Sequence, residues 1–187
     1  MPDIQFVIPA APVVVPALII TMTVAIARLQ HRGRLTPARL ATVVASSLYS
    51  AALVAVTLFP FRVALGRFSN PIPWYDKVNL VPLVTIDPPG FILNIVMMVP
   101  LGLLVPLLVR VRSVGAAALV GLAVSASIEL IQGVGKLTLS GVRTADVNDL
   151  IANTLGTVLG WCLLQQMTRS HRRAPADGLN AETVSSR

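Results

Sequence analysis

The chain has 187 residues, of which 55% are hydrophobic and only 12% are charged, and its mean hydropathy is +0.77. These values lie outside the range of soluble globular domains and indicate a polytopic membrane protein. The net charge of +7 does not indicate nucleic-acid binding, because the arginines stand in short segments between apolar runs and form no single basic face. The single cysteine, Cys162, excludes an intramolecular disulfide bond.

Five apolar runs have about the length that a helix needs to cross a bilayer. We expect the spans at about residues 7–27, 40–59, 91–109, 114–131 and 149–167. The fold class is therefore predicted to be all-α, a polytopic membrane helix bundle with about five transmembrane helices.

Basic residues predict the orientation of the bundle. Four arginines lie in segment 28–39, two follow the third span, and three more follow the fifth. By the positive-inside rule these segments are cytoplasmic, so the N-terminus lies outside and the C-terminus in the cytoplasm of a multi-pass cell-membrane protein. Asp3 is the only charge before the first apolar run, which favours an uncleaved anchor over a signal peptide.

The chain divides into three predicted regions. Residues 1–59 form two N-terminal transmembrane helices, and residues 60–168 form a membrane domain with an outer loop and three helices. Residues 169–187 form a basic and polar cytoplasmic tail, which we expect to be disordered. Within the outer loop, the run Asn79–Leu83 is a short apolar segment bounded by polar residues, which we expect to pack on the membrane face.

Polar residues from distant parts of the chain converge on the predicted outer side of the bundle. They are Asn79, Asn94, Glu129, Gln132, Arg143, Asp146, Asp149 and Asn153. A carboxylate at the centre of a spanning helix costs roughly 2.5–3.5 kcal/mol, so such residues need a reason. Asp146, Asp149 and Asn153 share one helix face if the helix begins by Asp146. Any one of these residues can be a structural ion-pair or capping residue, but the set favours a functional site.

Small residues recur at a spacing of four in the last two spans. Ala152, Gly156 and Gly160 form one stripe, and Ala117, Gly121 and Ser125 form a similar one. Such stripes let a second helix approach closely, either within one chain or between chains. An oligomer through the Gly156/Gly160 face is therefore possible.

Four motifs resemble the VanZ-like family over about Asp76 to Trp161. They are Asn79-Leu80-Val81-Pro82; Asn94 followed by Pro100-Leu101-Gly102; Ser125-x-x-x-Glu129-x-x-Gln132; and Arg143-x-x-Asp146-x-x-Asp149-x-x-x-Asn153-x-x-Gly156-x-x-x-Gly160. Leu83 departs from the family, which often has Phe there. The resemblance implies an integral membrane protein of the cell envelope, in a family whose founding member confers low-level resistance to the glycopeptide antibiotic teicoplanin. It does not imply that this chain confers antibiotic resistance.

The leading hypothesis is that the outward-facing polar residues bind an amphipathic ligand. Membrane lipids, a lipid-linked envelope precursor and a lipoglycopeptide are the candidate partners. Arg143 would engage a phosphate or carboxylate, and the asparagines would hydrogen-bond sugars or amides. No nucleic acid is expected as a partner.

Two further classes of function stay open. The chain is an enzyme if Glu129 works with Asp146 or Asp149 as general acid and base, or if these carboxylates hold a divalent cation at a lipid headgroup. Both histidines fall on the predicted cytoplasmic side and no metal, Walker or dinucleotide motif occurs, so we predict no cofactor and no dedicated metal site. Alternatively, the polar residues only lock helix ends together and the protein is a structural packing partner. A proton-coupled transporter is the weaker variant, because nothing ionisable marks the midplane.

Overall fold

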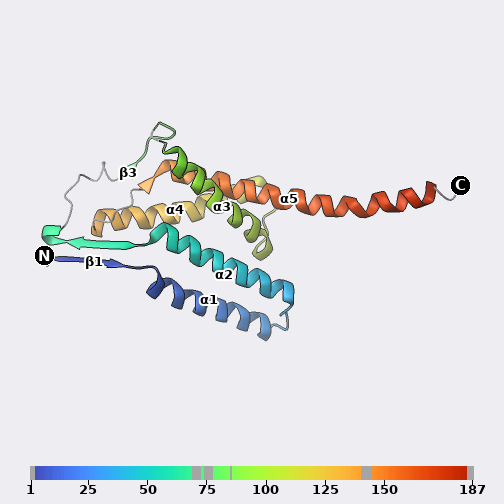
Figure 1. Ribbon diagram of the computed structural model, residues 1–187, viewed down its shortest axis with the longest axis horizontal. Coiled ribbons are helices and arrows are strands. Elements are labelled where there is room, and N and C mark those ends of the chain that lie inside the picture. Colours follow the sequence, from blue (N-terminus) through green and yellow to red (C-terminus); the bar gives the residue numbers. More distant parts are fainter. Residues whose placement is uncertain (1–2, 69–72, 74–77, 85, 140–144, 185–187) are drawn as a thin grey trace.

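The computed structural model describes residues 3–68, 73, 78–84, 86–139 and 145–184. Its helices are α1 (Ala11–His31), α2 (Pro37–Leu58), α3 (Pro88–Leu108), α4 (Val114–Leu139) and α5 (Val147–Val184). All five are long and apolar enough to cross a membrane, α5 through its segment Val147–Ser170. The helices run alongside one another, and α5 extends beyond the rest (Figure 1). The predicted bundle of five spanning helices is confirmed.

Helix starts follow from local sequence. Thr36 caps α2 by accepting a hydrogen bond from the backbone N–H of Arg39, and Asp87 caps α3 by accepting one from Gly90. Each cap is followed by proline, whose missing N–H costs nothing in the first turn. The chain therefore enters both helices at defined residues.

Three boundaries differ from those expected. α1 begins at Ala11 because the preceding residues, Ile4–Ile8, form a strand. α4 continues to Leu139, two turns beyond the expected end, so Glu129 and Gln132 lie inside the helix. α5 continues to Val184, through most of the segment expected to be a disordered tail, and extending an existing helix requires no new nucleation.

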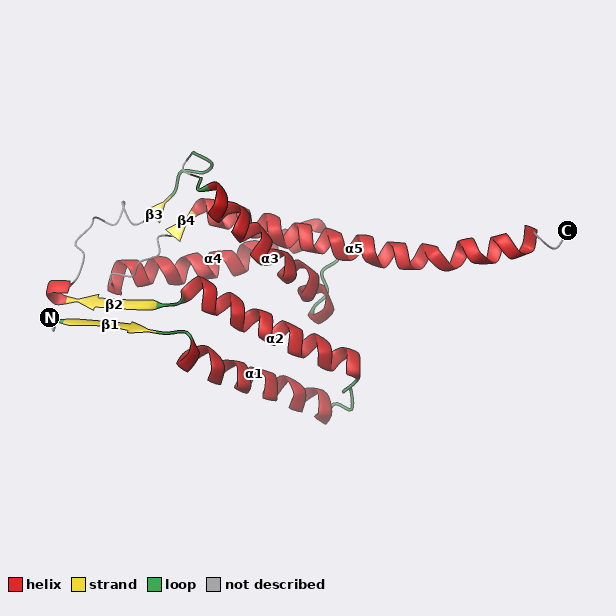
Figure 2. Cartoon of the chain, viewed as in Figure 1, coloured by secondary structure: helices red, strands yellow, loops and turns green. Residues whose placement is uncertain are grey.

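Two short sheets, which the sequence did not predict, close the end of the bundle where α2 ends and α3 and α5 begin. We call this the polar end. Strand β1 (Ile4–Ile8) pairs antiparallel with β2 (Phe61–Leu65), which is followed by a 3-10 turn, η1 (Gly66–Phe68). Strand β3 (Val78–Asn79) pairs in parallel with β4 (Ala145–Asp146). Because α1 and α2 run antiparallel, the segments flanking them emerge together and can pair (Figure 2).

The loops at the opposite end carry the predicted cytoplasmic arginines. The α1–α2 connection holds Arg32 and Arg34, and the α3–α4 connection holds Arg110 and Arg112. Figure 1 shows both connections away from β1–β4. The two ends of the bundle thus differ in charge as expected, while the side of the membrane that each faces stays a prediction.

Close packing of α3 against α5 builds the core of the bundle. A Cβ added at Gly156 would lie 2.2 Å from the carbonyl oxygen of Ile95, and one added at Gly160 would lie 2.0 Å from that of Val99. Met98 of α3, which lies against Gly156, is fully buried. The small-residue stripe of α5 therefore lets a helix approach as predicted, and the approaching helix is α3 of the same chain.

The second stripe packs on α5 as well. Ala117, Gly121 and Ser125 are buried on α4, and a Cβ added at Gly121 would lie 2.8 Å from the Cβ of Thr157. Helix α2 joins this three-helix core through Tyr49, whose hydroxyl donates to the carbonyl oxygen of Met97 at 3.0 Å. Helix α1 packs on α2.

Candidate functional site

Asp146 connects three elements at the polar end. The β3–β4 pairing places Asn79 opposite Asp146, and the Asn79 amide nitrogen donates to both carboxylate oxygens at 3.0 Å. The Asp146 backbone N–H donates to Glu129 of α4 at 2.8 Å, and its carboxylate accepts the backbone N–H of Asn148 at 2.8 Å. A carboxylate is favoured here because it stands at the positive end of the α5 dipole.

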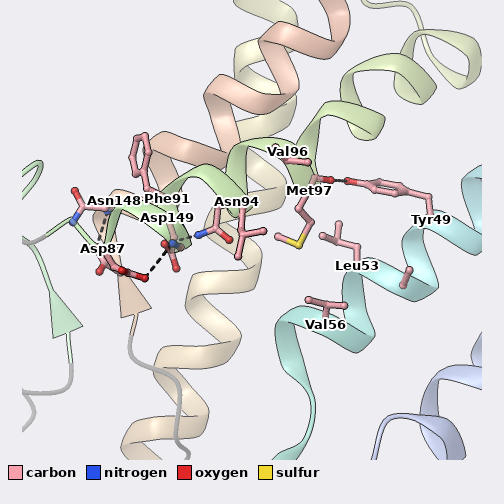
Figure 3. Close-up of a pocket in the computed structure, with 14 residues that line it drawn as sticks. Tyr49, Leu53, Val56, Asp87, Phe91, Asn94, Val96, Met97, Asn148 and Asp149 are labelled. Carbon is pink, nitrogen blue, oxygen red and sulfur yellow. Dashed lines mark hydrogen bonds between the residues drawn. The ribbon is translucent and has the colours of Figure 1, made fainter.

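Asp149, in the first turn of α5, reaches α3. Its carboxylate accepts a hydrogen bond of 2.6 Å from the side-chain amide of Asn94 (Figure 3). A hydrogen bond to an ionised acceptor is shorter and stronger than one between neutral groups. This bond therefore fixes the start of α5 against the first turns of α3.

Asn153 lies deeper in the bundle. It is 2% exposed, and its amide nitrogen donates to the Ser125 hydroxyl on α4 at 2.9 Å. Its Oδ1 has no hydrogen-bond partner among the described residues. Gln132 turns the other way and donates to the carbonyl oxygen of Thr57 near the end of α2, at 2.8 Å.

Among the described residues, the predicted site residues make several different contacts. Asn79, Glu129 and Asp146 form one hydrogen-bonded group, Asn94 and Asp149 form a pair, and Asn153 and Gln132 each face another helix. The expected single stripe of Asp146, Asp149 and Asn153 does not form, because Asp146 lies in β4 and precedes the helix. Arg143 lies outside the described residues.

A pocket of about 670 Å³ lies between α2 and α3, beside the start of α5. Helix α2 contributes Tyr49, Ala52, Leu53 and Val56; α3 and its cap contribute Asp87, Gly90, Phe91, Leu93, Asn94, Val96 and Met97; and the start of α5 contributes Asp146, Asn148 and Asp149. Asp87, Asn94, Asn148 and Asp149 gather at one end together with Phe91, and the aliphatic side chains and Tyr49 lie toward the other (Figure 3). Asn94, Asp146 and Asp149 are the predicted site residues that line it.

One comparison with known proteins matches this region. A model of the VanZ/LLP1 family matches residues 46–168. The chain belongs to the VanZ/LLP1 family. The match begins within α2, earlier than the resemblance seen in the motifs, so both walls of the pocket lie inside the family region. Searches of curated proteins and of solved structures found no match.

Sequence reasoning missed two polar residues of the pocket. Asn148 is 3% exposed; its Oδ1 accepts the backbone N–H of Leu83 at 2.8 Å, and its Nδ2 has no hydrogen-bond partner within the described ranges. Its place between two aspartates at the edge of an apolar run was the available signal. The second residue is Asp87, for which the available signal was its place before Pro-Pro-Gly, typical of a helix cap.

The polar end of the pocket offers carboxylates and amides. Among the described lining residues, Asp87, Asp146 and Asp149 carry the charges and no basic side chain is present. In the part of the chain that the structure describes, no three His, Cys, Asp or Glu side chains are grouped as a metal site. Carboxylates accept hydrogen bonds and amides both donate and accept them, so this end can hold hydroxyl, amide or amine groups.

Proposed function

We propose that this membrane protein of the VanZ/LLP1 family binds an amphipathic ligand, a membrane lipid or lipid-linked envelope precursor, in the pocket between α2 and α3. The observation that carries the proposal is the division of the pocket into an apolar wall and a polar end. An amphipathic molecule likewise has an apolar part and a polar part, which this wall and this end would contact.

The size and wall of the pocket suit an acyl chain. A volume of about 670 Å³ lies within the range of about 300–1,000 Å³ typical of small-molecule sites. Val56, Leu93 and Val96 are 59%, 66% and 60% exposed, and all three stand on helices long and apolar enough to span a membrane. These side chains are therefore accessible to lipid, so a chain can enter the pocket sideways from the bilayer.

The polar end suits the headgroup. Asp146 and Asp149 can accept hydrogen bonds from sugar hydroxyls, amides or amines, and Nδ2 of the buried Asn148, which has no partner in the described part of the chain, can donate one. A buried donor without a partner costs about 1–3 kcal/mol, which a bound acceptor would recover. A phosphate would require a cation such as Arg143, which the sequence places just before β4.

The same chemistry extends to lipoglycopeptides. Teicoplanin combines an acyl chain with sugars and a peptide, so we propose that occupancy of the pocket alters teicoplanin susceptibility. Vancomycin is the natural comparison, because it lacks the acyl chain that the apolar wall would hold.

Filling the pocket tests the proposal. Val56→Trp places a large side chain in the wall, whereas Val54→Trp makes the same substitution two residues earlier on α2, at a 40% exposed residue that does not line the pocket. Teicoplanin and vancomycin susceptibility would be measured in cells lacking the protein and complemented with wild type or either variant, at membrane levels matched by blot.

We expect wild type and Val54→Trp to raise teicoplanin tolerance selectively and Val56→Trp to lose the effect. Equal activity of both variants would exclude this pocket as the site. No effect of wild type would refute the link to teicoplanin.

A further inference from the structure

The loop that precedes α3 presents apolar side chains outward. Within Leu80–Val84, which we call the apolar hook, Leu80, Val81, Leu83 and Val84 are 70%, 51%, 62% and 79% exposed. Isolated exposed apolar residues are common on proteins, but a continuous exposed group marks an interaction surface. Pro82, the remaining residue of the hook, is also apolar.

The hook has a defined backbone and is not a loosely packed loop. The Val81 N–H donates to Oδ1 of Asn79 at 3.2 Å, and the Leu83 N–H donates to Oδ1 of the buried Asn148 at 2.8 Å. Asn79 is itself bound to Asp146. Leu83 has φ of 65°, a conformation that costs energy for a non-glycine residue and persists only where the surroundings hold it.

These hydrogen bonds also prepare the backbone to leave water. A backbone N–H that enters an apolar phase without a partner costs several kcal/mol. In the hook, the N–H groups of Val81 and Leu83 are bonded within the protein, and Pro82 has none. Three consecutive residues therefore leave no backbone donor that needs water.

The position of the hook indicates what covers it. The loop stands at the side of the bundle, level with the end of α2 and the start of α3, whereas β1, β2 and the end of α4 extend beyond that level (Figures 1 and 2). On α3, the helix that follows the hook in the chain, Ile92, Leu93 and Val96 are also exposed, at 59%, 66% and 60%. An exposed apolar segment at the level where one spanning helix ends and another begins faces the interfacial layer of the bilayer.

We propose that the apolar hook is inserted into the lipid interface beside the pocket. Insertion holds the pocket mouth at a fixed depth, with the polar end at the headgroup layer and the apolar wall among the acyl chains. The inference concerns the lipid contact of the hook and does not depend on the ligand of the pocket.

Site-specific fluorescence in nanodiscs tests the insertion. Cys162 is the only cysteine, so a Cys162→Ala background accepts single labels. Val81→Cys and Val7→Cys are matched probes, because both native side chains are 51% exposed, the first on the hook and the second on β1. Val96→Cys on α3 is the reference for lipid contact. Each would carry an environment-sensitive fluorophore in phosphatidylethanolamine–phosphatidylglycerol nanodiscs, with quenching by a spin-labelled lipid compared with quenching by iodide.

We expect the label at position 81 to have the blue-shifted emission and lipid quenching of the label at position 96. The label at position 7 should be quenched more strongly by iodide. Iodide quenching at position 81 equal to that at position 7 would overturn the proposal. If Val81→Cys does not reconstitute, Leu80→Cys, whose native side chain is 70% exposed on the same hook, gives the same test.

Discussion

Gly160→Ala should separate α3 from α5 and destabilise the bundle. The added Cβ would lie 2.0 Å from the carbonyl oxygen of Val99 and 3.0 Å from the Cα of Gly102. Both neighbours are backbone atoms, so no side-chain rotation can relieve the contact. Because relaxed carbon–oxygen contacts are about 3.3 Å or longer, the two helices must part locally by about 1 Å.

The cost follows from the packing that this separation weakens. The buried Met98 lies at the same helix pair, and a buried side chain of this size makes about 40–60 contacts of roughly 0.1–0.2 kcal/mol each. A gap of about 0.5–1 Å removes roughly a quarter to a half of such attraction, which amounts to about 1–6 kcal/mol for one side chain if all its contacts faced the gap, and to the lower part of that range when only one side does. We therefore expect Gly160→Ala to lower the free energy of unfolding by about 2 kcal/mol, within the range of about 1–3 kcal/mol typical of overpacking.

Unfolding of the purified protein in micelles, followed by circular dichroism during titration with a denaturing detergent, measures this loss. Gly115→Ala is the matched control, because the nearest described neighbour of its added Cβ would be the Ser113 hydroxyl at 4.0 Å. Without a clash, alanine in a helix is more stable than glycine by roughly 0.5–1 kcal/mol, so the control should be neutral or stabilised. A Gly160→Ala protein as stable as Gly115→Ala would refute the α3–α5 packing.

Two hydrogen-bond predictions use the same unfolding assay. Tyr49→Phe removes the hydroxyl that donates to Met97, so it should cost about 0.5–1.5 kcal/mol, whereas Ser127→Ala, which loses only a bond within its own helix, should be near neutral. Asp149→Ala leaves the Asn94 amide without its acceptor and should cost roughly 1–3 kcal/mol, whereas Asp149→Asn keeps an acceptor oxygen and should cost less. If the two variants of a pair lost equal free energy of unfolding, the hydrogen bond tested by that pair would not join the helices.

The helices of the bundle were predictable because each needs only a local signal. About 20 apolar residues make a span, and small residues every fourth position mark a close contact. The end of α4 was not predicted correctly, because a polar residue followed by glycines, as at Gln132, is typical of the end of a helix. The helix continues because that face packs on β2, where a Cβ at Gly135 would lie 3.1 Å from the Phe61 ring.

The sheets were not predictable in the same way, since their partners are distant in sequence. Ile4 pairs with Leu65 only because α1 and α2 bring the chain back to its start. Likewise, Asn79 meets Asp146 only because α3 and α4 intervene as an antiparallel pair. Periodicity within one segment contains no information about these pairings.

The sequence indicated some residues of the candidate site but not its shape. Among the described residues, Asn94, Asp146 and Asp149 line the pocket at the polar end, whereas Asn153 lies deeper in the bundle and Gln132 faces α2. The apolar wall supplied by Leu53 and Val56 could not be predicted from the sequence. Helix α2 has apolar residues on every face, so only its packing on α3 determines which residues line the pocket. Asn148 was missed because it does not belong to the expected stripe of Asp146, Asp149 and Asn153.

Native mass spectrometry of the protein released from membrane nanodiscs tests the central claim, that the pocket between α2 and α3 holds an amphipathic ligand. Wild type, Val56→Trp and Val54→Trp would be compared for retained lipid under identical conditions. The account predicts a defined bound lipid on wild type and Val54→Trp and its loss from Val56→Trp. Retention of the same lipid by Val56→Trp, or no retained lipid on wild type, would contradict it.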